Sequence, residues 1–369
     1  MSLLDRLGLA APIVQAPMAG TSTPRLAAAV SNAGGLGSIS VGAVRADRAR
    51  EMIGEVRRAT SGPFNVNVFC HRPARHDPAR NAAWLAALAP EFARCEATPP
   101  PQLAEIYTSL LADADMVDVL LDTPPPVVSF HFGLPSPEVI DRLKAAGIVL
   151  FATVTSLAEA EAAIVAGVDV LVAQGWEAGG HRGIFDPTGP DPQLGVAALT
   201  RMLVRRLDAP VIAAGGIMDG AGVAAMLALG AQAAQLGTAF IACPESSADA
   251  FHRAALFGPG ASATEMTALI SGRPARCLPN RFTALKAGAA GRTPIPDYPV
   301  AYDAGKALAS AARARGDGGY GAQWAGQGAP LARALPAADL MATLVRELAE
   351  AGKVRRVAER DERWIASTP

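Results

Sequence analysis

The residues 174–183 are the part of the chain whose composition points most directly to chemistry. They read QGWEAGGHRG and follow the apolar run VDVLVA, so His181 lies among several glycines. Glycine lets a ligand approach the main chain closely, and an imidazole, which ordinarily titrates near neutral pH, suits proton transfer or the stabilisation of negative charge. We interpret the stretch as a candidate active-site loop; a turn that happens to carry a histidine is the alternative.

The elements that must position this loop follow a regular alternation. Eight short, apolar, β-rich runs occur along the chain, and amphipathic helical patterns separate most of them. The runs lie at 12–17, 35–40, 63–69, 127–133, 148–154, 168–175, 210–216 and 233–241. Continuous apolar runs are typical of parallel strands buried on both faces, and eight strand–helix units predict an α/β fold of the (β/α)8 TIM-barrel type. The alternative is a doubly wound open sheet, but its GxGxxG dinucleotide fingerprint after the first strand is absent.

Two segments interrupt the alternation and define the expected domains. Residues 70–126 form an insertion after the third strand, and residues 242–323 follow the eighth strand without a prompt closing helix, which comes late at ADLMATLVRELAEAG. We therefore predict a barrel over 1–241, a smaller, mainly helical substrate-binding domain over 242–323, and a return to the barrel over 324–369. Long insertions where barrel strands end usually form lids or substrate domains.

In a barrel, the candidate residues meet at the carboxyl end of the strands, where such enzymes have their active sites. His181 follows strand six and His131 ends strand four, so both are expected at this face; a core histidine is the alternative for His131. Gly215 and Gly216 after strand seven, with Gly237 after strand eight, occupy the usual phosphate-binding loops of barrels. A tight turn would explain either loop alone, and both together favour a bound phosphate.

The composition limits the kinds of binding partner that we expect for this protein. A formal net charge of −1 gives no reason to expect nucleic acid or an anionic membrane. The four cysteines have no CxxC spacing, so neither a metal site nor a redox dithiol is indicated, and scattered cysteines suit a reducing cytoplasm. The first residues lack a basic leader and no apolar stretch reaches the length of a membrane span. We expect a cytoplasmic protein without a metal.

The motifs resemble those of the class I nitronate monooxygenases, FMN-dependent enzymes also called 2-nitropropane dioxygenases. The resemblance runs almost end to end, through APIVQAPMAG, FNVNVF, VVSFHFGLP, QGWEAGGHRG, PVIAAGGI, AAQLGTAF and WAGQG. EAGGH alone is shared with flavin-dependent enoyl-acyl-carrier-protein reductases and quinone reductases. SFHFGLP, YPVAYDAGK and the late WAGQG favour the class I monooxygenases.

The resemblance implies that FMN lies across the top of the barrel, below a catalytic His181 that acts as base or electrostatic partner. For Asn67, a buried amide at a strand end is the alternative to a flavin contact. The implied cofactor-binding residues are Pro17, Met18, Asn67, Gln174, Gly179, Gly215, Gly216, Gln235, Gly237 and Thr238. A phosphate with about two negative charges suits such backbone donors.

The resemblance also implies a substrate side. Its residues are His131, Tyr107, Tyr298, Tyr302 and Lys306. The last three are four apart and would share one face of a helix, where phenol and ammonium groups suit an anion; ordinary packing of an amphipathic helix is the alternative. His71, His76 and His252 read as surface or hinge residues.

The implied reaction takes an alkyl nitronate, such as propionate 3-nitronate, and dioxygen to a carbonyl compound and nitrite without a nicotinamide. Two alternatives are kept: an NAD(P)H-dependent flavin reductase of the same superfamily, and a non-catalytic flavin binder. The expected partners are a small anionic nitronate and dioxygen, with no nucleic acid and no membrane. A homodimer, the physiological nitronate and the use of neutral nitroalkanes are left open.

Overall fold

The computed structural model describes residues 2–366, with side chains up to residue 352. Eight parallel strands form the central sheet in the order β1-β9-β8-β6-β5-β4-β3-β2, and a bridge from Val14 to Leu36 joins its two ends into a ring. The strands are β1 (Ile13–Gln15), β2 (Gly37–Ser40), β3 (Phe64–Phe69), β4 (Val127–His131), β5 (Val149–Val154), β6 (Val170–Gln174), β8 (Val211–Ala214) and β9 (Ala233–Leu236). The predicted TIM barrel is confirmed.

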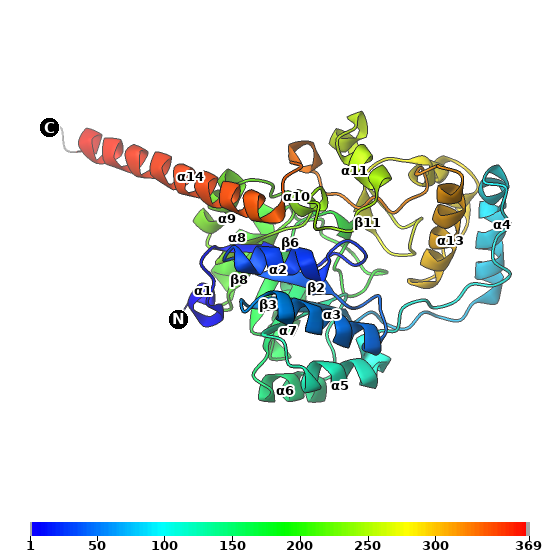
Figure 1. The fold of residues 1–369 in the computed structure, drawn as a ribbon, viewed down its shortest axis with the longest axis horizontal. Coiled ribbons are helices and arrows are strands. Elements are labelled where there is room, and N and C mark those ends of the chain that lie inside the picture. Colours follow the sequence, from blue (N-terminus) through cyan, green and yellow to red (C-terminus); the bar gives the residue numbers. More distant parts are fainter. Residues whose placement is uncertain (1, 367–369) are drawn as a thin grey trace.

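Helices surround this ring. They are α2 (Pro24–Asn32), α3 (Ala46–Ala59), α5 (Ala114–Asp122), α6 (Pro137–Ala145), α7 (Leu157–Val165), α8 (Val196–Arg206), α9 (Gly220–Ala228) and α14 (Ala337–Ala366), with the short α1 (Leu3–Leu7) before the first strand. Thr23, Ser156 and Asp219 cap the amino ends of α2, α7 and α9 by accepting a backbone N–H. The late helix α14 packs on α2 and α9 and extends away from the barrel (Figure 1).

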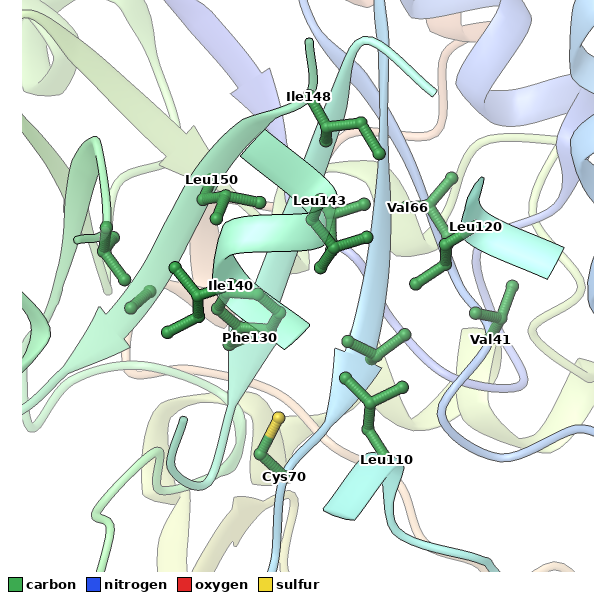
Figure 2. Close-up of a cluster of buried hydrophobic side chains, with 14 of the residues drawn as sticks. Val41, Val66, Cys70, Leu110, Leu120, Phe130, Ile140, Leu143, Ile148 and Leu150 are labelled. Carbon is green, nitrogen blue, oxygen red and sulfur yellow. The ribbon is translucent and has the colours of Figure 1, made fainter. Parts of the chain in front are cut away.

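The largest apolar core lies between the strands and their covering helices. Figure 2 shows part of it, where Phe130 and Leu150 of adjacent strands meet Ile140 and Leu143 of α6. These side chains are almost completely buried, as expected for strands that helices cover on the outer face. The core fixes the strand ends, and therefore the loops that carry the candidate residues.

The two inserted segments pack together on one side of the barrel mouth. Helix α4 (Pro78–Arg94) contacts α13 (Val300–Ala314), and Trp84 and Phe92 share an apolar cluster with Leu308 and Tyr320 (Figure 1). A small antiparallel sheet of β10 (Glu265–Thr267), β11 (Ala275–Cys277) and β7 (Gly180–His181) links this layer to the loop after β6. The remaining helices are α10 (Thr238–Ile241), α11 (Ala250–Leu256), α12 (Arg281–Ala284) and the 3-10 turns η1 (Leu110–Ala112), η2 (Pro259–Ala263), η3 (Leu285–Ala287), η4 (Ala290–Arg292) and η5 (Ala329–Leu331).

Two predicted elements need correction. The apolar run 233–241 is not one strand, because β9 ends at Leu236 and α10 begins at Thr238. Within 70–126, helix α5 contacts α3 and α6 and so belongs to the barrel wall, not to the inserted layer. None of the helices within residues 2–366 is long and apolar enough to cross a membrane.

Candidate active site

A cavity of about 900 Å³ opens at the carboxyl ends of the barrel strands, a size within the range of pockets that bind small molecules. Every residue of the predicted site lines it: Pro17, Met18, Asn67, Tyr107, His131, Gln174, Gly179, His181, Gly215, Gly216, Gln235, Gly237, Thr238, Tyr298, Tyr302 and Lys306. Residues from distant parts of the chain thus share one cavity. What each of them binds stays a prediction.

His181 is held through its backbone. As the last residue of β7 it pairs with Ala275 of β11, so the inserted segment fixes one side of its loop. Its carbonyl accepts a hydrogen bond from Nε2 of Gln174 at 3.0 Å and lies 3.3 Å from Nε2 of His131. On the ring itself, Nε2 lies 2.9 Å from Oγ of Ser271. These contacts position the imidazole at the cavity wall.

The imidazoles of this site are neutral at physiological pH. Burial, followed by the proximity of His131 and Arg273, lowers the pKa of His181 to about 3. Burial and Arg273 lower the pKa of His131 to about 3 as well. The ordinary pKa of histidine, near neutral pH, therefore does not apply to these two rings, because loss of solvent penalises the charged form. A neutral imidazole can accept a proton or donate a single hydrogen bond.

The predicted substrate residues form an aromatic group beside His181. The ring centres of Tyr298 and His181 are 5.3 Å apart. The ammonium of Lys306 lies 4.9 Å from the ring centre of Tyr107 and 5.6 Å from that of Tyr302, within the range of cation–π attraction. Tyr302 and Lys306 lie on α13, whereas Tyr298 precedes the helix, so the expected shared helix face holds for only two of the three.

The same burial shifts the pKa values of the phenols and of the ammonium. It raises the pKa of Tyr302 to about 12 and that of Tyr298 well above its ordinary value, so both remain neutral hydrogen-bond donors. Burial lowers the pKa of Lys306, although Asp303 opposes this. The group therefore offers uncharged donors and one partly desolvated cation to an anion.

Another part of the cavity wall is rich in backbone donors. Gly215 and Gly216 have φ values of +127° and +68°, which glycine adopts without strain. The N–H groups of Gly215, Gly216, Gly237 and Thr238 donate to no acceptor within the described part of the chain. Partnerless N–H groups converging on a cavity suit an oxyanion such as a phosphate.

The side-chain amides of Asn67 and Gln174, which also line the cavity, already make hydrogen bonds within the protein. Nδ2 of Asn67 donates to the carbonyl and to Oγ of Ser129 at 3.1 and 3.0 Å, and its Oδ1 accepts from Ser40 at 3.1 Å. The side chain of Gln174 bridges the loop that carries His181. A ligand at these two positions would share the amides with the protein.

Sequence reasoning assigned no role to several residues that the structure brings to the site. Ser271 contacts His181 from 90 positions away. Phe132, at φ +73°, lies between His131 and the buried guanidinium of Arg273, which is 4.2 Å from its ring centre. The ring of Trp324 is 5.1 Å from that of His181, and only its place in the glycine-rich WAGQG motif could have drawn attention to it.

Two histidines were placed wrongly. His71 and His252 are buried rather than at the surface or a hinge. His71 packs edge-on against Tyr298 at 5.0 Å between ring centres, and Nε2 of His252 lies 3.1 Å from the carbonyl of Trp324. Tyr298 of the inserted segment packs against His71, and His252 is buried within that segment, in α11. His76 is exposed as expected.

Comparison with known proteins extends over almost the whole chain. Residues 2–347 match the family model for nitronate monooxygenase. The nitronate monooxygenase of Paraburkholderia phytofirmans is 62% identical over 348 residues, which cover 94% of each chain. That of Pseudomonas aeruginosa is 55% identical over 342 residues, covering 93% of this chain and 97% of the relative. The solved structure of nitroalkane oxidase from Streptomyces ansochromogenes is similar with a TM-score of 0.87 and 43% identity, covering 96% of this chain and 99% of that one.

Proposed function

The chain belongs to the nitronate monooxygenase family, and on that basis we propose that it oxidises alkyl nitronates, such as propionate 3-nitronate, with dioxygen to a carbonyl compound and nitrite. The observation that carries the proposal is the single cavity that combines His181, the tyrosine–lysine group and a row of free backbone donors. The tyrosine–lysine group can hold an anion while the backbone donors hold a phosphate.

The family is flavin-dependent, and FMN is the flavin that we propose for this cavity. The free N–H groups of Gly215, Gly216, Gly237 and Thr238 would hold its phosphate. Pro17, Met18, Asn67, Gln174, Gly179 and Gln235 would contact the remainder from the cavity wall. FMN, when bound, supplies the electron transfer from substrate to dioxygen that side chains cannot perform. The donors suffice for one phosphate, which favours FMN over FAD.

The chain's own residues position the substrate and move its proton. Lys306 and the phenols of Tyr107, Tyr298 and Tyr302 would hold the negative charge of the nitronate. His181, uncharged because of burial, would take the proton from the carbon next to the nitro group when a neutral nitroalkane binds. A nitronate has already lost that proton and needs only to be oriented.

The proposal includes a reducing, cytoplasmic location. Four free, buried cysteines support it, because disulfides are rare in that compartment. Burial raises the pKa of Cys243 and Cys277 to about 12, so these thiols are poor nucleophiles and unlike redox-sensing cysteines.

A comparison of reductants tests the function. The purified protein is mixed without oxygen, in separate samples, with propionate 3-nitronate and with NADH, while flavin absorbance is followed. We expect the nitronate to change the flavin spectrum rapidly and NADH to act slowly. Fast bleaching by NADH, at the rate of turnover with a quinone or an enoyl thioester, would favour the reductase alternative. Mass analysis of the flavin released by heat should give FMN, and a colourless protein that stays inactive with added FMN would contradict the proposal.

A further inference from the structure

Ser271 lies against His181 at a point where hydrogen-bond rules determine which nitrogen carries the proton. The side chain of Ser271 is completely buried. Its Oγ is 2.9 Å from Nε2 of His181, 3.1 Å from the carbonyl oxygen of Arg273 and 3.4 Å from the backbone nitrogen of Arg273. A hydroxyl has one proton to donate and two lone pairs, so these three contacts constrain each other.

Only one arrangement satisfies all three contacts. The carbonyl of Arg273 can only accept, and no other group among the described residues donates to it. The hydroxyl proton of Ser271 therefore points to that carbonyl, and its lone pairs accept from the N–H of Arg273 and from Nε2–H of His181. The reverse arrangement, with Ser271 donating to Nε2, would leave a buried carbonyl without a donor, which is costly.

The other ring nitrogen of His181 is then the one without a proton. Nδ1 makes no hydrogen bond with the described residues. It is nevertheless not one of the fully buried side-chain atoms that lack a hydrogen-bond partner. Since His181 lines the cavity, Nδ1 is reached from that side. We propose that Ser271 is a positioning residue that holds His181 as the Nε2–H tautomer, so that Nδ1 presents a lone pair to the substrate.

This inference deepens the proposed function and separates two roles for His181. An uncharged imidazole with a lone pair at Nδ1 is a base, and it cannot donate a hydrogen bond to a nitronate oxygen until it has taken a proton. The low pKa that burial and Arg273 impose keeps the ring uncharged, so the tautomer decides its role. His181 is therefore the base for neutral nitroalkanes, and Ser271 contributes to that step alone.

Nitrogen NMR of the flavin-loaded protein, labelled with ¹⁵N only in histidine, reports the tautomer without any assay. The chain has five histidines, and the signals absent from His181→Asn belong to His181. We expect a protonated Nε2 and an unprotonated Nδ1 in the unaltered protein and in Ser271→Thr, which keeps the hydroxyl. Ser271→Ala should show a mixture or the opposite tautomer. A protonated Nδ1 in the unaltered protein would overturn the inference, whether or not nitronates are oxidised.

Kinetics of Ser271→Ala give the second readout. We expect kcat/KM to fall roughly tenfold to a hundredfold for neutral nitroethane, because a hydrogen bond to a group that becomes charged is lost, and to change little for ethyl nitronate. Ser262→Ala, at an exposed serine of the same inserted segment, is the matched control. Equal losses on both substrate forms would show that Ser271 has only a structural role. Inactivity of the unaltered protein on every nitronate would instead count against the proposed function.

Discussion

Gln174 donates from Nε2 to the backbone carbonyl of His181 at 3.0 Å. Its Oε1 accepts from the N–H of Gly183 at 2.7 Å, so one side chain holds the loop at His181 and again two residues beyond it. The shape of this loop therefore depends on Gln174 and on the pairing of β7 with β11, and the imidazole is free to serve chemistry.

This relationship predicts the outcome of His181→Asn. The fold and the bound flavin should be retained, with a change in unfolding free energy within about 1 kcal/mol, because the ring has one hydrogen bond to the protein. Turnover of neutral nitroalkanes should fall by about two to four orders of magnitude, as is typical when a positioned base is removed, and turnover of nitronates should fall less. Steady-state kcat/KM for both forms measures this. Near-normal activity on both would move the chemistry to His131.

A pair of glycine variants tests the phosphate cradle, by which we mean the free N–H groups of Gly215, Gly216, Gly237 and Thr238. Gly216 and Gly8 have almost the same φ, +68° and +66°. A Cβ at Gly8 would meet no atom within 4 Å, whereas a Cβ at Gly216 would lie 3.2 Å from Cβ of Glu177, a close contact that adds to the backbone strain. Alanine at either position should cost roughly 1–2 kcal/mol of stability from backbone strain. Only Gly216→Ala should also weaken FMN binding, by at least about tenfold, because it disturbs the N–H groups of the cradle. Titration of the two apoproteins with FMN measures this, and equal affinities would refute the cradle.

Removing the ammonium group of Lys306, which lies near the rings of Tyr107 and Tyr302, should weaken substrate binding. Lys306→Met keeps a long, unbranched side chain but loses the charge. The KM for propionate 3-nitronate should rise about tenfold, the value of one hydrogen bond to a charged group, with little change in kcat. Lys286→Met, at an exposed lysine paired with Glu265, is the matched control. A KM that responds equally in both variants would remove Lys306 from the substrate site.

The buried histidines should make the protein sensitive to acid. Burial, with the nearby Arg273, lowers the pKa of His71 to about 4 and that of His131 and His181 to about 3, against an ordinary value near 6.5. Between these values the unfolded chain binds protons that the folded chain does not, so stability is complete above about pH 6.5 and falls as the pH falls toward 4. A backbone hydrogen bond with Tyr107 opposes the lowering of the His71 pKa but does not cancel it.

Urea unfolding at pH 7.5 and pH 5 checks this sensitivity to acid. The midpoint should be lower at pH 5, and the difference should be smaller in His71→Leu, which removes one of the groups whose pKa is lowered. His71 does not line the cavity, although its ring packs against that of Tyr298, so the variant is compared by its unfolding and not by its activity. Midpoints that are equal at the two pH values would show that the histidines are not held uncharged by the fold.

The barrel was predictable from sequence because each strand is a continuous apolar run, whose pattern is local. The boundary at Leu236 was missed for the same reason, since the short helix that follows it is equally apolar. The site could be predicted where a motif ends a strand, as with His131 and Gln174. The burial of His71 and His252 could not, because it depends on packing between segments far apart in the chain.

The contacts that affect the protonation of His181 could not be predicted from the sequence either. Ser271 and Arg273 come from the inserted segment, which the pairing of β11 with β7 joins to the loop that carries His181. Their spacing in the chain carries no period or motif that would associate them with a histidine 90 positions earlier. The lowered pKa of His181 follows from that burial, and so from the fold rather than from the residue type.

The most direct measurement is an aerobic assay of the purified yellow protein with propionate 3-nitronate and no nicotinamide. Nitrite release and oxygen uptake are recorded together, first for the unaltered protein and then for Lys306→Met. We predict oxygen-dependent release of nitrite from the unaltered protein and a raised KM in the variant. Absence of nitrite from a protein that carries its flavin, together with steady oxidation of NADH by a quinone or an enoyl thioester, would contradict the assignment to nitronate oxidation.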